Sequence, residues 1–366
     1  MGFNCGIIGL PNVGKSTLFN ALTGSKSALA ENYPFCTIEP NIGRVPLYDE
    51  RLVNISKIAS SKNAIPTFIE FIDIAGLVKG ASKGEGLGNK FLSKIRETDA
   101  ICHVIRCFEN DDISHVSGKI DPLRDLEIVE TELMIADIER LERKKINVTK
   151  KARGQDKFAK KTLEVINTTI EKITKGTPAR DISLEQEYMN VIKELNLLTY
   201  KPILYIANVS EEAVKLGNTD SKILEEYGVK KNIKTITLSI KLESEISEIS
   251  ETTERLKFIN ALGLSQSGLD KLSKAGYGLL NLITFFTTGI KETRAWTIMK
   301  GTKANIAAGR IHNDFSRGFI AAETISYEDY TLYNGEQNAK EAGKMRIEGK
   351  DYEVIDGDII LFRFNI

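Results

Sequence analysis

A phosphate-binding loop stands near the N-terminus. Residues 9–17 read Gly-Leu-Pro-Asn-Val-Gly-Lys-Ser-Thr, the pattern G-x-x-x-x-G-K-[ST], and they follow an apolar run and precede a helix-like segment. Glycines let backbone N–H groups turn toward a phosphate chain, and the helix N-terminus adds its positive dipole end. Lys15 is expected to neutralise the phosphates and act in catalysis, and Ser16 to ligate Mg²⁺. The predicted nucleotide contacts in this loop are Asn12, Val13, Gly14, Lys15, Ser16 and Thr17.

A second element of the same site is an apolar run, 67–72, that ends in Asp73-Ile74-Ala75-Gly76. A hydrophobic strand ending in D-x-x-G places its carboxylate beside Mg²⁺, and the glycine N–H can follow the γ-phosphate. We therefore predict Asp73 as a metal-supporting residue and Gly76 as a nucleotide contact. On its own, D-x-x-G is weak evidence for a nucleotide site, but downstream of a phosphate loop it is strong evidence.

Between these two motifs, Thr37 occupies the place of a switch threonine whose hydroxyl would complete the Mg²⁺ shell only with a triphosphate bound. The alternative is a loop threonine that caps a turn. Glycines then recur through residues 76–88, a composition that favours a segment able to order and disorder with the γ-phosphate.

Two departures separate the chain from an ordinary GTPase. Leu77 stands where Ras-like enzymes place the glutamine that orients water, so hydrolysis should be slow or organised by another group. After the apolar run 202–207, Asn208-Val209-Ser210-Glu211 replaces the Asn-Lys-x-Asp of a guanine reader. Because asparagine offers both a donor and an acceptor to an adenine edge, we expect specificity to lean away from GTP.

These motifs resemble those of the YchF-type Obg-like ATPases. The resemblance covers essentially the whole chain, and the residues that carry it are 6–17, 35–40, 73–88, 106–110, 208–211 and 294–297. It implies an α/β fold: a Ras-like P-loop NTPase domain with an inserted antiparallel helical (coiled-coil) domain and a C-terminal β-grasp (TGS) domain. It also implies a preference for ATP over GTP and association with ribosomes.

The resemblance assigns further roles. Asn208 would read the adenine edge, Val209 would pack on the base, and Ser16 and Thr37 would hold Mg²⁺. His115 matches the place from which the family is thought to bring a catalytic histidine, since an imidazole can position or deprotonate water near neutral pH. A surface histidine in a polar loop is the alternative. Asn12 fits a pattern of GTPases that use K⁺, or else is an ordinary loop asparagine.

Helical periodicity dominates the region from about 123 to 199. Two amphipathic runs joined by residues 150–155 predict an antiparallel helical pair that projects from the nucleotide domain. Residues 140–161 carry ten Lys/Arg against two acids. A solvated helix face is the usual explanation of a charge run, but one sign of charge at a projecting turn equally predicts contact with RNA phosphates.

The C-terminal part, 281–364, has short β-rich runs separated by glycine, including 296–299, 318–320, 352–355 and 358–362, which predict a small α+β domain. Residues 291–317 hold six basic and two acidic side chains, either an RNA-facing surface or an ordinary domain face. An acidic helix or linker is expected at 241–254. The predicted domains are therefore a nucleotide domain, 3–259, containing the insertion, and a TGS domain, 281–364.

Composition fits a cytoplasmic protein without membrane spans: 42% hydrophobic and 27% charged residues, 50 basic and 50 acidic side chains, and four cysteines that form no C-x-x-C pair. We expect a monomer, because nothing demands a dimer. The predicted function is a Mg²⁺-dependent ATPase of low turnover that acts as a switch on the translation machinery. The alternatives are an Obg-type GTPase and a ribosome-binding regulator whose hydrolysis is incidental.

Overall fold

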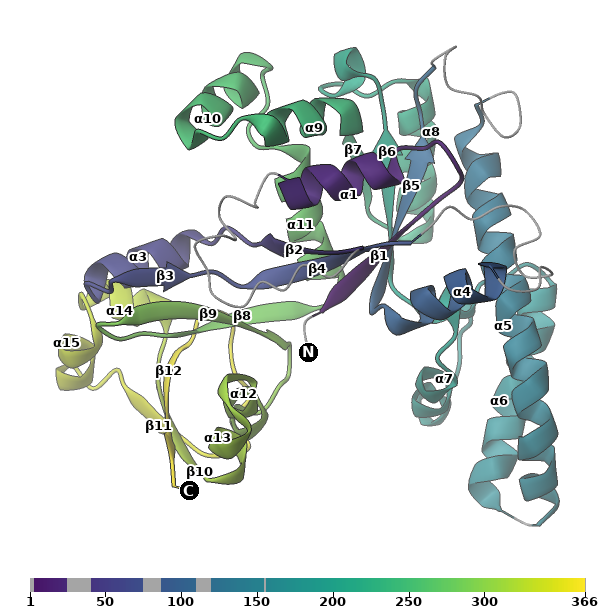
Figure 1. The fold of residues 1–366 in the computed structure, drawn as a ribbon. Helices are drawn as coiled ribbons and strands as arrows, with labels where there is room; N and C mark the ends of the chain where they lie inside the picture. Colours follow the sequence, from purple (N-terminus) through teal and green to yellow (C-terminus); the bar gives the residue numbers. More distant parts are fainter. Residues whose placement is uncertain (1–2, 25–40, 75–86, 110–119, 155, 366) are drawn as a thin grey trace. The chain divides into compact units, whose positions relative to one another are not determined.

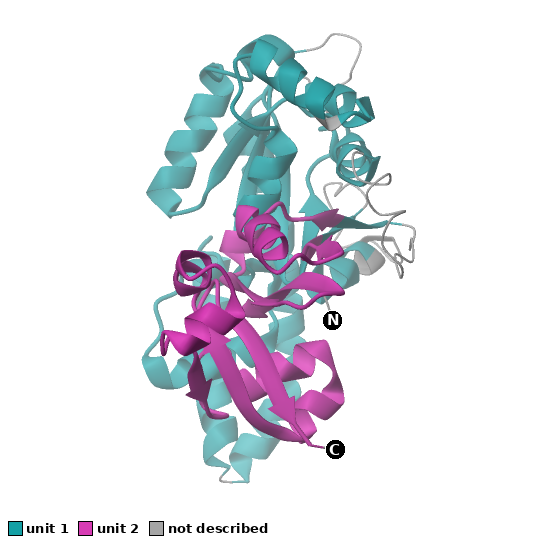
Figure 2. Ribbon diagram, turned by 90° about the vertical axis from the view of Figure 1, so that its left-hand side faces the viewer, with its two compact units in different colours: residues 1, 3–44, 70–276 teal, residues 2, 45–69, 277–366 magenta. Residues whose placement is uncertain are grey.

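The computed structural model describes residues 3–24, 41–74, 87–109, 120–154 and 156–365. The chain divides into two compact units, which Figure 2 colours separately. Unit 1 contains residues 3–44 and 70–276, and unit 2 contains residues 45–69 and 277–366. Residues 45–69 lie within the nucleotide domain predicted at 3–259, but they belong to unit 2.

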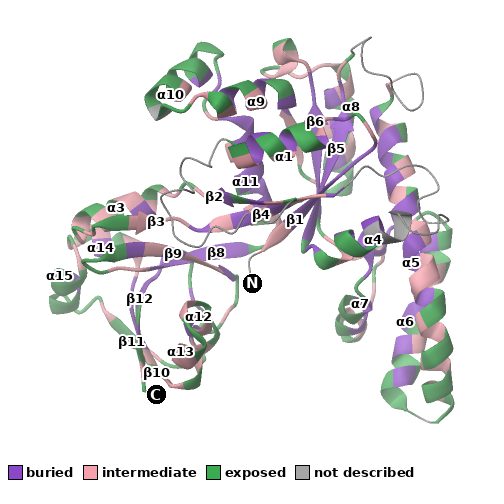
Figure 3. Cartoon of the chain, in the orientation of Figure 1, coloured by how far each residue is buried: buried purple, intermediate pink, exposed green. Residues whose placement is uncertain are grey.

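Unit 1 is built on a six-stranded sheet with the order β2-β4-β1-β5-β6-β7. Its neighbours from β4 to β7 all pair in parallel. The strands are β1 (Asn4–Ile8), β2 (Ile42–Pro46), β4 (Phe68–Asp73), β5 (Ala100–Arg106), β6 (Ile203–Asn208) and β7 (Thr235–Leu238). Every residue of β5 and β6 is buried, as expected for strands covered on both faces (Figure 3).

The helices of unit 1 surround this sheet or extend from it (Figure 1). They are α1 (Lys15–Gly24), α4 (Leu87–Glu97), α5 (Pro122–Arg153), α6 (Lys157–Thr174), α7 (Met189–Leu195), α8 (Thr219–Lys231), α9 (Ile240–Glu248), α10 (Thr252–Ala261) and α11 (Gly268–Leu279). Because the carboxyl ends of parallel strands share one edge of a sheet, the C-terminal ends of β1, β4, β5, β6 and β7 lie at that edge.

The long helices α5 and α6 form the predicted antiparallel pair. Each begins at an aspartate cap: the Asp121 carboxylate accepts from Arg124 N at 3.1 Å, and that of Asp156 accepts from Phe158 N at 2.9 Å. Buried Leu141, Val165 and other apolar residues join them. Helix α5 continues through Arg153, so the predicted connection at 150–155 is shorter than expected. Beyond α6 the insertion consists of short helical turns and α7.

Unit 2 has a second sheet with the order β11-β10-β12-β8-β9-β3. Its strands are β3 (Asn63–Ile65), β8 (Leu282–Thr287), β9 (Glu292–Met299), β10 (Phe319–Ile325), β11 (Arg346–Glu348) and β12 (Ile359–Phe364). Its helices are α3 (Glu50–Ile58), α12 (Ala304–Ile311), α13 (Asn313–Arg317), α14 (Tyr327–Leu332) and α15 (Glu336–Glu341). Successive residues of a strand face opposite sides, so Phe285 and Phe286 enter two separate cores.

The strand predicted at 352–355 is wrong, because only an isolated bridge joins Glu353 to Lys303. The backbone turns here instead: Ile355 N donates to the Asp358 carboxylate at 2.9 Å, and the Tyr352 hydroxyl donates to the same oxygen at 2.7 Å. Among the residues that the structure describes, no helix combines the length and the apolar character that a bilayer crossing requires.

Candidate nucleotide site

Two glycines of the loop between β1 and α1 stand at positions where a side chain would be strained or would clash. Gly9 has φ +151°, and a Cβ there would lie 2.4 Å from the Val104 carbonyl oxygen. Gly14 has φ +100°, and its Cβ would lie 3.0 Å from the Asn208 side chain. Asn12 also has a positive φ, 61°, and is exposed. Both glycines of the motif are therefore required by the geometry of the loop.

Lys15 opens α1 and is only 7% exposed. Its ammonium group donates to the Leu10 carbonyl oxygen at 2.6 Å, so the loop itself holds the charge in place. Burial lowers the pKa of Lys15 to about 8, and the nearby Asp73 carboxylate opposes this shift. A polyphosphate would replace the carbonyl with a stronger, charged acceptor.

Ser16 and Asp73 are brought together as the sequence predicted. The Ser16 hydroxyl donates to Asp73 Oδ2 at 3.2 Å, because β1 and β4 are neighbours and Ile7 lies opposite Asp73. The other oxygen, Asp73 Oδ1, is buried and has no hydrogen-bond partner among the described residues. A hydroxyl and a carboxylate with an unused buried oxygen fit Mg²⁺, which takes hard oxygen ligands.

Asn208 ties two loops of the site together. Its Nδ2 donates to the Val13 carbonyl oxygen at 3.0 Å, and its Oδ1 accepts from Ile240 N at 3.0 Å. The residue is 5% exposed, and one amide hydrogen remains for a ligand. A single donor can reach an atom that adenine and guanine share, so Asn208 alone supplies no reason for choosing between the two bases.

The neighbours of Asn208 bear on base choice in different ways. Val209 is 2% exposed, so little of its side chain is accessible to a base. Its N–H donates to the Leu238 carbonyl oxygen at 3.0 Å. Glu211, at the position of the guanine-reading aspartate, forms an ion pair with Lys241 at 2.6 Å. A cation therefore already engages the carboxylate that guanine would need.

Sequence reasoning missed the loop after β7. Ile240 N holds Asn208, and the Ile240 side chain would contact a Cβ at Gly14 at 3.1 Å. The available signal was Ser239, a helix cap directly after a strand, whose hydroxyl accepts from Leu242 N at 3.4 Å. In a parallel sheet this position lies at the same edge as the phosphate loop.

Three predicted site residues, Thr37, Gly76 and His115, lie outside the described residues. Thr17 is exposed on the first turn of α1. The other histidine of this region, His103, is fully enclosed in β5, where burial and the charges of Lys15 and Arg180 lower its pKa to about 3. It is a neutral structural residue.

The basic face expected at 291–317 is partly neutralised within unit 2. Lys303 forms an ion pair with Asp351 at 2.7 Å, and the Arg294 guanidinium lies 4.3 Å from the centre of the Trp296 ring. Phe315 stacks on Phe364 at 3.8 Å between ring centres. These contacts favour an ordinary domain face over a dedicated RNA surface.

Comparisons with known proteins cover the whole chain. A family model described as a 50S ribosome-binding GTPase matches residues 4–151, and the YchF-GTPase C-terminal model, described as a protein of unknown function (DUF933), matches residues 282–365. The ribosome-binding ATPase YchF of Bacillus subtilis (strain 168) is 52% identical over 370 residues, and that of Escherichia coli O157:H7 is 52% identical over 367 residues. Both alignments span 100% of each chain.

A solved structure agrees with this result. The Schizosaccharomyces pombe YchF GTPase superposes with a TM-score of 0.90 at 37% identity, over 99% of this chain and 98% of that one. The predicted fold class, a Ras-like P-loop domain with a helical insertion and a C-terminal domain, is thereby confirmed. With full-length identity of this degree, the chain belongs to the YchF family.

Proposed function

We propose that this chain binds and hydrolyses ATP and uses the reaction as a switch on the ribosome. The relatives that match over the full length are named ribosome-binding ATPases, and the chain has a phosphate loop, its lysine and a hydroxyl–carboxylate pair able to hold the metal ion that the reaction needs. The observation that carries the proposal is the cluster of Lys15, Ser16 and Asp73 at one edge of the sheet, with Asp73 Oδ1 buried and without a partner among the described residues.

Each residue has a defined task in this mechanism. Lys15 exchanges the Leu10 carbonyl for the outer phosphates and stabilises charge that develops on them. Ser16 and Asp73 would hold Mg²⁺, which when bound neutralises phosphate charge. Asn208 fixes the phosphate loop against the loop after β7, so that the base and the phosphates are held by one connected frame.

For the residues outside the described ranges we keep the roles predicted from the sequence motifs and from the family resemblance. Thr37 completes the Mg²⁺ shell when the triphosphate is bound, and the Gly76 N–H follows the γ-phosphate. His115 positions the attacking water, since Leu77 cannot. Asn12, which lies within the described ranges as an exposed residue of the phosphate loop, supports a K⁺ ion there.

The choice of ATP over GTP is supported by the Glu211–Lys241 ion pair. Guanine presents N–H donors to a free carboxylate, and here that carboxylate is paired with a lysine. Recognition of adenine does not require a free carboxylate at this position. The observation therefore favours the ATPase over the Obg-type GTPase.

The ribosome is the macromolecular partner, and the basic end of the α5–α6 pair is the contact that we propose with RNA phosphates. The face of unit 2 at 291–317 contributes less, because two of its cations, Lys303 and Arg294, have partners within the unit. Ribosome binding places the protein in the cytoplasm, where we expect it as a monomer.

Single-turnover hydrolysis of ATP, with and without purified ribosomes, tests this function. We expect ribosomes to accelerate γ-phosphate release by wild-type protein at least tenfold, and His115→Ala to lose most of that acceleration while it still binds ATP. Equal rates in all four reactions would contradict the switch and favour a regulator whose hydrolysis is incidental.

A further inference from the structure

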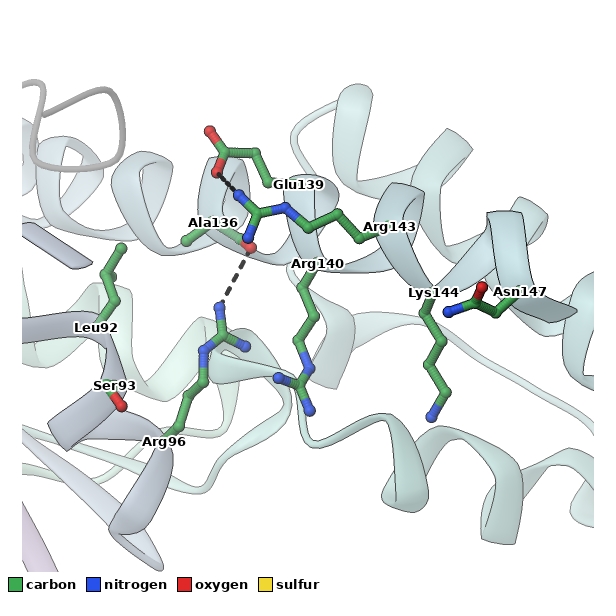
Figure 4. Close-up of a pocket in the computed structure, with 9 residues that line it drawn as sticks. All are labelled: Leu92, Ser93, Arg96, Ala136, Glu139, Arg140, Arg143, Lys144 and Asn147. Atoms are coloured by element: carbon green, nitrogen blue, oxygen red, sulfur yellow. Dashed lines mark hydrogen bonds and ion pairs between the residues drawn. The ribbon is translucent and has the colours of Figure 1, made fainter. Parts of the chain in front are cut away.

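A basic pocket lies between α4 and α5 in unit 1. Its volume is about 580 Å³, within the range of small-ligand sites. Helix α4 contributes Leu92, Ser93 and Arg96, and helix α5 contributes Ala136, Glu139, Arg140, Arg143, Lys144 and Asn147 (Figure 4). Arg96 shortly precedes the start of β5, whereas the phosphate loop follows the end of β1. The pocket therefore belongs to the edge of the sheet opposite the nucleotide.

The charges of this pocket are strongly unbalanced. Four cationic side chains line it with a single acid, Glu139, and that acid pairs with Arg143 at 3.5 Å. Figure 4 shows Arg143 turned toward Glu139, while Arg140 and Lys144 extend together in the other direction, toward the side of Arg96. Arg96, Arg140 and Lys144 therefore line the pocket, and none of them has a carboxylate partner among its lining residues.

Contacts with backbone carbonyl groups hold the two arginines in place. Arg96 Nη2 donates to the Ala136 carbonyl oxygen at 3.3 Å, and Arg140 Nε donates to the Leu195 carbonyl oxygen at 3.1 Å. Arg96 Nη1 is buried, lies 4.0 Å from Asp137 Oδ1, and has no hydrogen-bond partner among the described residues. The Arg140 guanidinium is thus oriented through Nε and keeps its two amino groups for a ligand, whereas Arg96 is held by Ala136 and lies beside Asp137.

The like charges repel each other. Burial lowers the pKa of Arg96, Asp137 opposes this effect, and the charges of Arg140 and Arg143 add to the lowering. Asp137 beside Arg96 and Glu139 beside Arg143 offset part of this repulsion, and the part that remains lowers the stability of the folded protein. An anion in the pocket would remove that cost and satisfy the remaining donors.

The pocket continues along α5 as a stripe of polar residues. Arg140, Lys144, Asn147 and Lys151 follow one another at steps of four, three and four, so they lie on one face of the helix. From Arg140 to Lys151 this face extends about 16 Å. Its far end reaches the basic turn between α5 and α6.

We propose that the α4–α5 pocket is a seat for one phosphate group, bound by Arg96, Arg140 and Lys144. The phosphate belongs to an RNA backbone that continues along the stripe of α5, or to a free phosphate compound. Guanidinium groups bind phosphate oxygens through two parallel hydrogen bonds, which explains arginine at both oriented positions. The choice of RNA rests on the ribosome role proposed above, but the seat itself does not.

Binding of a fluorescein-labelled single-stranded RNA of about 12 nucleotides, followed by anisotropy at several KCl concentrations, tests the seat. The full chain is first saturated with ADP and Mg²⁺ so that the phosphate loop is occupied. We expect Arg140→Gln and Lys144→Gln to weaken RNA binding about tenfold each and to lower the salt slope by about one.

Lys145→Gln is the matched control, because it removes the same charge from the same helix on a different face. We expect it to change RNA affinity less than twofold. Equal losses in Lys144→Gln and Lys145→Gln, or wild-type affinity in Arg140→Gln, would overturn the seat and leave only diffuse attraction by the helix.

Pyrophosphate, added as a competitor of the bound RNA at constant ionic strength, distinguishes the two sources. Competition that disappears in Arg140→Gln identifies a seat that accepts free phosphates. No competition, with RNA binding that still depends on Arg140, identifies a seat for the RNA backbone alone. ATP affinity, measured on the same variants, should equal that of wild type. A wild-type chain without ATP affinity would contradict the proposed ATPase and leave the seat standing.

Discussion

Lys15 shows how single residues of the nucleotide site are prepared for a ligand. The ammonium group is enclosed by the loop, hydrogen-bonded to Leu10, and has a pKa lowered to about 8 by burial. A triphosphate would raise this pKa, because negative charge favours the protonated lysine. The bound form therefore holds a proton more tightly than the free form, and binding takes up protons at and above pH 8.

The resulting prediction is that ATP affinity is constant between pH 6.5 and 7.5 and falls as the pH rises through 8, by up to about tenfold per unit. Calorimetry at pH 8 in two buffers of different ionisation enthalpy should show net proton uptake. Lys15→Arg is the control, since its guanidinium stays charged and its residual binding should not change with pH. Constant wild-type affinity from pH 7 to 9.5 would contradict the role given to burial.

Lys241 carries a second prediction at this scale. Lys241→Ala releases the Glu211 carboxylate, which can then accept from the N–H groups of guanine. We expect GTP to gain about threefold in affinity relative to ATP, a modest effect because both partners are exposed. Competitive titration of ATP and GTP measures this affinity ratio in wild type and in Lys241→Ala. Lys230→Ala, which removes an exposed lysine of α8, is the control. A ratio that changes equally in both variants would show that the ion pair has no part in base choice.

The sequence was sufficient to predict the part of the site that depends on local pattern. The phosphate loop and Asp73 are recognisable because glycine spacing and a strand ending fix them, and the structure brings them together. The contacts of Asn208 with Val13 and Ile240 join residues far apart in the chain, so no local pattern could reveal them. The same holds for the partner of Glu211.

At the scale of elements, the α5–α6 pair is anchored by a buried carboxylate. Asp137 is fully buried and accepts from Leu198 N, Thr199 N and the Thr199 hydroxyl, each at 2.8 Å. It connects α5 to the end of the insertion. The periodic spacing of apolar residues predicted the two helices. It gave no indication that Asp137, on the buried side of α5, bonds to Leu198 and Thr199.

We expect Asp137→Ala to lower the free energy of unfolding of this region by about 3 kcal/mol, since buried donors lose their acceptor. Removal of the exposed cap in Asp156→Ala should cost about 1 kcal/mol. Amide hydrogen exchange at Leu198 and Thr199 reports the local change. Unaltered protection of these two amides in Asp137→Ala would refute the anchoring role.

At the scale of the whole molecule, residues 45–69 belong to unit 2 although they lie between two elements of the nucleotide site in sequence. Leu52 and Ile55 of α3 are buried in one core with Phe286 and Tyr330, and β3 pairs with β9. The sequence predicted the C-terminal domain from its short β-rich runs separated by glycine. It could not predict this contribution, because pairing between distant segments leaves no local signal.

A fragment of residues 277–366 should therefore be less stable than the same residues in the full chain, because it lacks two large side chains of a core and one edge strand. Thermal unfolding followed by circular dichroism tests this. Fusion of residues 45–69 to the fragment through a flexible linker should restore the lost stability. A fragment that melts cooperatively at the temperature of unit 2 in the full chain would show that α3 and β3 are dispensable.

Side-by-side titration of ATP and GTP, in the presence of Mg²⁺ and of EDTA, tests the central claim most directly. We predict that wild-type protein binds ATP more tightly than GTP, that EDTA weakens the binding, and that Lys15→Ala lowers ATP affinity at least a hundredfold. A clear preference for GTP, or ATP affinity that neither Lys15→Ala nor EDTA reduces, would contradict the account of this site.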